Sequence, residues 1–247
     1  MTRFHLAPDA VHGDRVAFDA ATAHHLGHVL RAAVGDVVHA VAAGGELLTV
    51  RLTAIAARRA EGVVESRTEL RTESRCHLTL AQGIPKGDKM ESVIRMTTEL
   101  GVTRVVPLIT ARTVVRLEPA RRAARVARWQ RVAREAAQQS GRAAVPEIAE
   151  PCELEVWRRQ DSADGGLLIC FWEEAREGLE HRLPAGPCAR ATLVVGPEGG
   201  LAAEEVAGLR DAGALVASLG PRLLRTETAG VVAVALLQSR YGDLGSA

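Results

Sequence analysis

Aromatic side chains are scarce in this chain: phenylalanine, tyrosine and tryptophan together make up 3% of its 247 residues. The core must therefore be built from Ala, Val and Leu, within a hydrophobic content of 47% that is ordinary for a globular protein. Lysine is found only at positions 86 and 89, so nearly all cations are arginines. The net charge is only +1, and any nucleic-acid-binding surface must therefore be local.

The four cysteines are far apart and form no CxxC motif. Their spacing favours buried free thiols over disulfides or a zinc site, and we predict no metal site. His24 and His28 lie one helical turn apart, but no acidic or cysteine partner is near them in the sequence. The N-terminus has no apolar signal core, and the apolar run 229–237 is less than half the ~20 residues of a membrane-spanning helix. We therefore expect a cytoplasmic protein.

The chain is expected to form two domains, 1–71 and 76–247, joined by the polar stretch 68–75. The first domain is expected to consist mostly of short strands, with a hairpin turn at Gly44-Gly45 and one helix at about 21–31. The second alternates strands with helices, which argues for an α/β fold with a parallel sheet. Its strands are expected at 77–84, 104–109, 167–172, 191–195 and 214–219.

The last quarter of the chain contains two short apolar runs, 191–195 and 214–219, and each leads directly into a Gly-Pro pair. Such a run is typical of a parallel strand covered on both faces. Gly and Pro then end the strand, because Gly permits unusual backbone angles and Pro lacks an N–H group. Thr226 is expected to cap the helix that follows the second loop, at about 227–240. If the two strands are neighbours, both loops lie at the sheet edge where α/β proteins bind ligands.

Two further helices carry basic residues. Asp88 and Glu91 resemble a capping box at the start of the helix that carries Lys89. A long helix begins at Pro119, with an apolar stripe on one side and six arginines on the others. This arginine-rich helix is either a solvated surface or a phosphate-binding one, and binding to phosphate would depend on salt.

GPEGGL at 196–201 and LGPRLLRTETAG at 219–230 closely resemble the two C-terminal motifs of the RsmE-type ribosomal RNA methyltransferases, which belong to the SPOUT superfamily. The resemblance also includes HHLGHVLR at 24–31, KGDKMESVI at 86–94 and ELGVTRVVPL at 99–108. It implies a C-terminal SPOUT parallel-sheet domain with a deep trefoil knot and a small N-terminal PUA-like RNA-binding β-barrel.

The same resemblance implies the reaction and the partners. S-adenosylmethionine is the implied methyl donor, and the implied acceptor is N3 of a uridine in 16S ribosomal RNA, within the small ribosomal subunit. A homodimer formed through the knotted domain is also implied. Gln138 departs from the family pattern, in which Glu is usual.

The glycine-containing loops and the resemblance together predict two sets of binding residues. For the cofactor they are Leu193, Gly196, Pro197, Glu198, Gly199, Gly200, Leu219, Gly220, Leu223, Leu224 and Thr226. For RNA they are Arg3, His25, Arg31, Lys86, Lys89, Arg112, Arg142 and Arg222.

Methylation at uridine N3 requires removal of the N3 proton or stabilisation of the anion that remains. We expect Arg225 to orient the target and stabilise the anion. Glu198 is the second candidate, as an acid–base group if a low-dielectric site raises its pKa. Glu227 is the third, although an acidic residue in the first turn also stabilises a helix. Gly230 stands in the same helix, where glycine costs about 1 kcal/mol relative to Ala unless close packing requires it.

Other functions stay open at this stage. The chain fits a non-catalytic RNA-binding or ribosome-assembly factor, and a SPOUT-type methyltransferase with a different RNA target. A nucleotide-dependent enzyme is disfavoured, because no GxxxxGK[ST] motif is present and no GxGxxG follows a strand.

Overall fold

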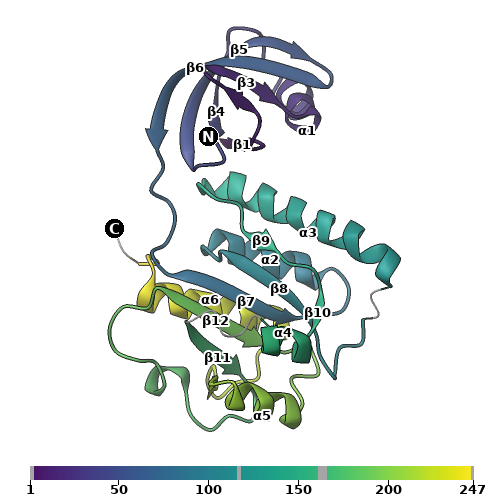
Figure 1. The fold of residues 1–247 in the computed structure, drawn as a ribbon, viewed down its shortest axis with the longest axis vertical. Helices are drawn as coiled ribbons and strands as arrows, with labels where there is room; N and C mark the ends of the chain where they lie inside the picture. Colours follow the sequence, from purple (N-terminus) through teal and green to yellow (C-terminus); the bar gives the residue numbers. More distant parts are fainter. Residues whose placement is uncertain (1–2, 116–117, 161–165, 246–247) are drawn as a thin grey trace. The chain divides into compact units, whose positions relative to one another are not determined.

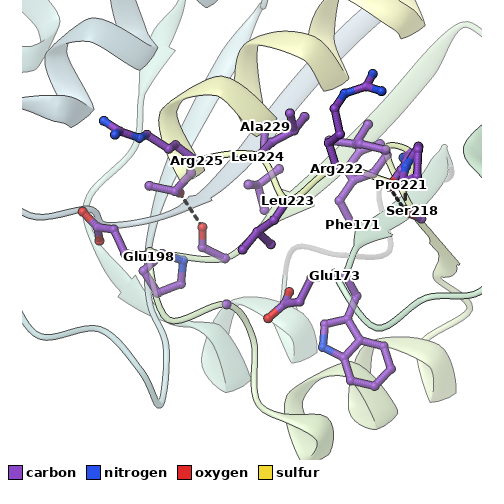
Figure 2. Close-up of a pocket in the computed structure, with 18 of the residues that line it drawn as sticks. Phe171, Glu173, Glu198, Ser218, Pro221, Arg222, Leu223, Leu224, Arg225 and Ala229 are labelled. Carbon is purple, nitrogen blue, oxygen red and sulfur yellow. Dashed lines mark hydrogen bonds between the residues drawn. The ribbon is translucent and has the colours of Figure 1, made fainter.

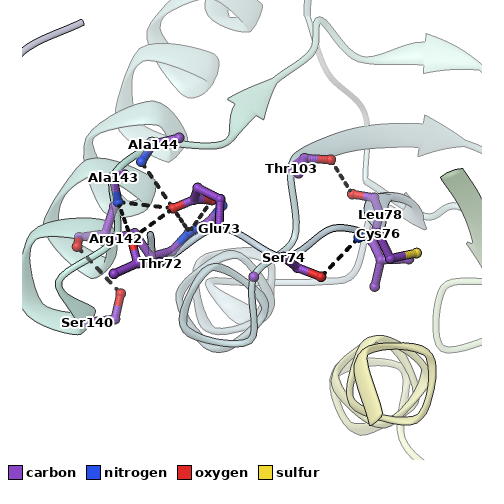
Figure 3. Close-up of polar contacts among 12 residues, drawn as sticks. Thr72, Glu73, Ser74, Cys76, Leu78, Thr103, Ser140, Arg142, Ala143 and Ala144 are labelled. Atoms are coloured by element: carbon purple, nitrogen blue, oxygen red, sulfur yellow. Dashed lines mark hydrogen bonds and ion pairs between the residues drawn. The ribbon is translucent and has the colours of Figure 1, made fainter. Parts of the chain in front are cut away.

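The computed structural model describes residues 3–115, 118–160 and 166–245, which separate into two compact units. Unit 1 is Met1–Glu73 with Ala137–Val145, and unit 2 is Ser74–Ala136 with Pro146–Ala247. The sequence predicted that residues 137–145 belong to the second domain, but the structure assigns them to unit 1. They are held there by Glu73, whose carboxylate accepts hydrogen bonds from the N–H groups of Ala143 and Ala144 at 3.0 and 3.2 Å (Figure 3).

Unit 1 is built on a six-stranded, curled sheet with the strand order β1-β4-β5-β6-β3-β2 (Figure 1). All neighbouring pairs are antiparallel except β1 and β4. The hairpin predicted at Gly44-Gly45 is confirmed, and the Ala42 N–H donates to the Glu46 carbonyl across it. The strands are β1 (Arg3–His5), β2 (Val11–His12), β3 (Arg15–Phe18), β4 (Val37–Val41), β5 (Glu46–Ala56) and β6 (Arg59–Glu69).

The predicted helix of unit 1 is present as α1 (Ala20–His24), which continues into one π-helical turn, η1 (His25–Val29). Asp19 caps it by accepting a hydrogen bond from the Thr22 N–H at 2.7 Å. Leu26 is fully buried in the core of this unit, which also contains Phe4 and Phe18. Helix and sheet thus share one hydrophobic core.

Unit 2 contains a seven-stranded sheet with the order β10-β8-β7-β12-β11-β13, in which β9 also pairs with β8. Every pair is parallel, which confirms the α/β prediction. The expected adjacency of the two Gly-Pro strands is wrong, because β11 lies between β12 and β13. The strands are β7 (His77–Gly83), β8 (Arg104–Ile109), β9 (Glu147–Ile148), β10 (Cys152–Glu153), β11 (Leu167–Phe171), β12 (Arg190–Val195) and β13 (Leu215–Ala217).

Helices cover both faces of this sheet. On one face, α4 and α5 pack on Ala81 and Val194 through a core that includes Trp157 and Leu209. On the other face, α6 packs against α2 and lies beside Leu80 of β7, since successive strand residues point to opposite faces. The helices are α2 (Lys89–Glu99), α3 (Pro119–Ser140), α4 (Leu154–Gln160), α5 (Ala203–Asp211) and α6 (Thr226–Tyr241), with a short 3₁₀ turn, η2 (Leu179–His181).

The capping box predicted at the start of α2 is wrong. Asp88 precedes the helix, but its side chain makes no capping hydrogen bond. Glu91 instead forms an ion pair with Arg128 of α3, with Oε1 2.7 Å from Nε. The arginines of α3 are thus partly engaged within the protein: Arg128 in this pair and Arg125 over the ring of Trp129.

Helix α6 buries one face, which contains Ala233, Val234 and Leu237. On its other side, Leu236 is 43% exposed, so the helix is not enclosed by this chain alone. None of the described helices is both long and apolar enough to span a membrane.

Candidate functional site

Three loops meet at one edge of the parallel sheet, where β11, β12 and β13 end. They enclose a cavity of about 530 Å³, large enough for a small-molecule ligand (Figure 2). Parallel strands place all their carboxyl ends at one edge, so the loops meet although β12 and β13 are not neighbours. The residues that line the cavity are Lys89, Phe171, Trp172, Glu173, Val195, Gly196, Pro197, Glu198, Gly200, Ser218, Leu219, Gly220, Pro221, Arg222, Leu223, Leu224, Arg225, Thr226 and Ala229.

The loop after β12 is shaped by close backbone approaches. Gly200 has φ +70° and closes a turn in which its N–H donates to the Pro197 carbonyl at 2.9 Å. A Cβ at Gly200 would collide with the carboxylate of Glu173. A Cβ at Gly83, in β7, would lie 2.5 Å from the Pro197 nitrogen. Only glycine fits at these two positions, and the loop is held tightly between β7 and the loop after β11.

The sequence predicted that Thr226 caps α6, and this prediction is wrong. The residue in the capping position is Arg225, which makes no side-chain capping bond. The hydroxyl of Thr226 instead donates to the Gly196 carbonyl at 2.6 Å and accepts from Nε2 of Gln82 at 2.9 Å. Thr226 is buried, so its hydroxyl links the start of α6 to the loop after β12.

The loop after β13 presents apolar and cationic groups together. Leu223 is 85% exposed, a large exposure for an apolar side chain that lines a cavity. Arg222 and Arg225 are also exposed, and in the view of Figure 2 they lie on opposite sides of the cavity. Among the described residues, the backbone N–H groups of Leu219 and Leu223 donate to no partner. These polar and apolar groups are available to a ligand.

Lys89 lies between two carboxylates at the rim of the cavity. Its Nζ is 3.0 Å from Oε1 of Glu198 and 3.5 Å from Oε2 of Glu227. The Lys86 N–H also donates to Glu198, at 3.0 Å. Burial raises the pKa of Glu198, but the hydrogen bonds from Lys89 and from backbone N–H groups outweigh it and lower the pKa below its usual value. The hydrogen bond to Glu198 likewise raises the pKa of Lys89.

This arrangement corrects three sequence predictions, those for Glu198, Glu227 and Lys89. The acid–base role of Glu198 required a raised pKa, and the pKa is lowered. Glu227 does not line the cavity, and Lys89 is held by the two carboxylates rather than free for RNA phosphate. We therefore assign Glu198 and Glu227 to holding Lys89 at the rim.

Two predicted cofactor residues do not line the cavity. Leu193 is fully buried in β12, and its side chain belongs to the core. Gly199 lies on the outer side of its loop, where its carbonyl accepts a hydrogen bond from Nη1 of Arg112 at 2.8 Å. The loop that carries Arg112 is fixed in turn by Glu205, whose Oε1 accepts from the Ala111 N–H at 2.8 Å. Arg112 therefore supports the loop after β12.

Phe171, the last residue of β11, and Trp172 and Glu173 in the loop after it line the cavity, and none of the three was among the predicted cofactor residues. Gln82 was also missed, because a glutamine inside a strand carries no local signature. Gln138 lies in α3 and lines no part of the cavity.

The predicted RNA contacts in unit 1 differ in their availability. The prediction that Arg142 contacts RNA is wrong, because its side chain is only 5% exposed and its Nη2 lies 2.5 Å from Oε2 of Glu73 (Figure 3). Arg3 donates a hydrogen bond to the Gly141 carbonyl, and the ring of His25 packs edge-on against Phe4. Arg31 is exposed and has a positive φ of 54°. In unit 2, Lys86 and Arg222 are exposed.

The described residues contain no group of three His, Cys, Asp or Glu side chains that could hold a metal ion. His24 and His28 stack on each other with their ring centroids 4.3 Å apart. All four cysteines are free: Cys76 and Cys170 are buried, and Cys152 and Cys188 are half-buried.

A parallel α/β sheet with a ligand-sized cavity between the loops at its carboxyl edge defines a small-molecule-binding α/β domain. Residues 72–238 match the RNA methyltransferase domain family. The chain is 30% identical over 221 residues to ribosomal RNA small subunit methyltransferase E of Bacillus subtilis, an alignment that covers 87% of this chain and 86% of the relative.

Two solved structures are similar over almost the whole chain. One is a protein from Legionella pneumophila in complex with the bound cofactor SAM (S-adenosylmethionine), with a TM-score of 0.90 and 30% identity over 98% of this chain and 99% of that one. The other is ribosomal RNA small subunit methyltransferase E from Neisseria gonorrhoeae bound to S-adenosylmethionine, with a TM-score of 0.88 and 32% identity over 98% and 99%. The chain belongs to the ribosomal RNA small subunit methyltransferase E family.

Proposed function

We propose that this chain transfers a methyl group from S-adenosylmethionine to N3 of a specific uridine in the 16S ribosomal RNA of the small subunit. The relatives it matches are ribosomal RNA small subunit methyltransferases, and two similar structures hold S-adenosylmethionine. The observation that carries the proposal is the cavity enclosed by the loops after β11, β12 and β13. Non-catalytic RNA binding would not require such a cavity.

The residues of the cavity fit this cofactor. Its volume of about 530 Å³ lies within the range of small-molecule sites. Leu219, Leu223 and Leu224 supply an apolar surface for an adenine ring, and free backbone N–H groups supply hydrogen bonds to its edge. Among the described residues, the buried Trp172 Nε1 has no partner. Gly200 allows the carboxylate of Glu173 to approach the loop after β12, where a Cβ would collide with it.

When bound, the cofactor supplies an electrophilic methyl group, so the protein's task is to align the target and favour loss of the N3 proton. Arg225 lies at the start of α6 and lines the cavity. In this proposal its cation stabilises the negative charge that develops on N3 and the flanking carbonyl oxygens. The N3 proton leaves to solvent in this scheme. Lys89 is held at the rim by Glu198 and Glu227, which balance its charge, so Arg225 is the cation on which this scheme relies.

We further propose that unit 1 is a PUA-like RNA-binding domain and that the domains correspond to the predicted 1–71 and 76–247, with 137–145 added to the first. Exposed Arg31 is then an RNA contact of unit 1, and Lys86 and Arg222 are RNA contacts near the cavity. A ribosomal RNA substrate places the protein in the cytoplasm.

We also propose that the C-terminal segment forms a trefoil knot and that two chains pair through this region. After β13, at the edge of the sheet, the chain returns to pack α6 on α2, β7 and β12, which is the path that threading through a loop requires. In this proposal a partner subunit packs on the side of α6 that carries Leu236, which is 43% exposed. Light scattering should give twice the monomer mass, and a monomer at micromolar concentration would contradict the dimer.

The test of function is methylation of small ribosomal subunits that lack this modification. The protein and S-adenosylmethionine are incubated with those subunits, and the methylated base is mapped by mass spectrometry. We expect one methyl group at N3 of a single uridine. A methyl group on a ribose, on another RNA, or on no RNA despite tight cofactor binding would contradict the proposal.

A further inference from the structure

Gln82 is a fully buried glutamine in β7 whose amide nitrogen lies where three elements meet. Its Nε2 is 2.9 Å from Oγ1 of Thr226, 3.3 Å from the Gly196 carbonyl and 3.2 Å from its neighbour's carbonyl at Gly83. The hydroxyl of Thr226 in turn donates a hydrogen bond to the Gly196 carbonyl. One amide group thus links the central strand, the loop after β12 and the first turn of α6.

The other end of the same amide has no partner. Oε1 of Gln82 is buried and accepts no hydrogen bond from any residue that the structure describes. An unsatisfied buried acceptor lowers stability, and an apolar residue of similar size would avoid that cost. Folding alone therefore does not account for a glutamine at this position.

The linked groups are the walls of the cavity. Gly196 and Thr226 both line it: Gly196 is in the loop after β12, and Thr226 begins α6 after the loop that follows β13. Strand β11 lies between β12 and β13. No pairing of adjacent strands fixes one loop against the other. The hydrogen bonds among Gln82, Thr226 and Gly196 provide this connection, from a side chain that does not itself line the cavity.

We propose that Gln82 is a positioning residue for the cofactor site: its amide fixes the loop after β12 against the start of α6 and so maintains the shape that S-adenosylmethionine requires. This inference rests on the proposed function. A shift of about 1 Å in a binding loop is enough to weaken ligand binding and alignment strongly. Removing the amide should therefore weaken binding more than it weakens folding.

The test compares cofactor affinity with stability in the full-length protein. Gln82→Leu and Thr226→Val remove the two side-chain partners while nearly preserving volume. Calorimetry should show the Kd for S-adenosylmethionine rising at least about tenfold in each, and the double variant should be little worse than either single one, because both act through one network. Thr226→Ser retains the hydroxyl and should bind within about threefold of the unmodified protein.

Gln238 provides a matched control. It is also a fully buried glutamine and also joins α6 to other elements, through Ser74 Oγ at 2.7 Å and the Gly101 carbonyl at 3.1 Å. It lies at the opposite end of α6 from the cavity. Gln238→Leu should lower the thermal unfolding temperature and leave the Kd unchanged.

Each result decides between the possibilities. If Gln82→Leu folds and binds like the unmodified protein, or if Gln238→Leu weakens binding equally, the positioning role is wrong. If Gln82→Leu does not fold, Thr226→Val and Thr226→Ser decide it: equal affinities in those two overturn the role. If the unmodified protein itself does not bind S-adenosylmethionine, the proposed function fails first.

Discussion

Gly230 of α6 packs directly against the amide of Gln82 in β7. A Cβ at position 230 would lie 2.6 Å from Oε1 of Gln82 and 3.4 Å from Cδ2 of Leu80. The glycine that is unfavourable for a helix by itself is therefore required by the approach of this helix to the sheet.

Gly230→Ala should destabilise the protein even though alanine is the better helix former. Helix propensity alone favours the variant by about 1 kcal/mol, but forcing a methyl group into a packed core costs about 1–3 kcal/mol. We expect a net loss of about 1 kcal/mol in urea unfolding. Gly208→Ala in α5 is the control, because its Cβ would meet only the ends of flexible side chains, Arg158 at 3.2 Å and Glu155 at 3.5 Å. A gain of stability in both variants would contradict the packing argument.

Arg225→Ala should abolish most catalysis and spare cofactor binding. Loss of one group that stabilises a developing anion typically lowers kcat by about 10²–10³-fold. Single-turnover methylation should show this loss, and circular dichroism should show an unchanged fold, because Arg225 is exposed. Arg222→Ala should mainly raise KM for RNA and reduce its salt dependence. Undiminished turnover in Arg225→Ala would remove this residue from the mechanism.

Lys89→Met should raise the pKa of Glu198. In the folded protein that pKa is lowered, so the interaction stabilises the fold above the unfolded pKa of the carboxyl and is lost as pH falls through the folded pKa. The raised pKa of Lys89 adds an upper limit, since its contribution is lost as pH rises through that value. Without Lys89, the hydrogen bond and the charge that lower this pKa are lost, while burial continues to raise it.

Carbon-detected NMR of the glutamate carboxyls measures this change. Lys86→Met is the control, because Lys86 reaches Glu198 through its backbone N–H, which the substitution retains. An unchanged Glu198 pKa in Lys89→Met would show that Lys89 does not determine it.

Arg142→Met should destabilise unit 1 by about 2–3 kcal/mol, because it leaves the carboxylate of Glu73 without its cation in a partly buried place. Arg71→Met removes a comparable pair with Glu69, in which the side chains are 85% and 72% exposed. That variant should lose at most about 1 kcal/mol. Hydrogen exchange of β5 and β6 amides reports the stability of this unit, and equal losses would contradict a structural role for Arg142.

The thiols should differ in reactivity. Burial raises the pKa of Cys76 to about 12, with a smaller contribution from nearby Cys188, and burial also raises the pKa of Cys170 to about 12. Since the thiolate is the reactive form, both should resist a disulfide reagent at pH 8 until the protein unfolds. Mass spectrometry of the labelled protein should find only Cys152 and Cys188 modified. Rapid labelling of Cys170 would show that the core opens.

Local sequence patterns determined much of this protein. The apolar run at 104–109 predicted β8 with the bounds that the structure has, Arg104–Ile109. The two Gly-Pro pairs located the loops that line the cavity, because an apolar run followed by Gly and Pro is a local signal of a strand end. The parallel α/β class followed from the alternation of elements along the chain.

Only the tertiary structure decided which strands are neighbours and which charges are free. Strand order depends on packing between distant segments, so β11 could lie between β12 and β13 without any local mark. Arg142 is neutralised by a carboxylate 69 residues away, and Lys89 by one 109 residues away. An exposed cation and a paired one have the same letter in a sequence, because the free energy that distinguishes them comes from partners that only the fold brings together.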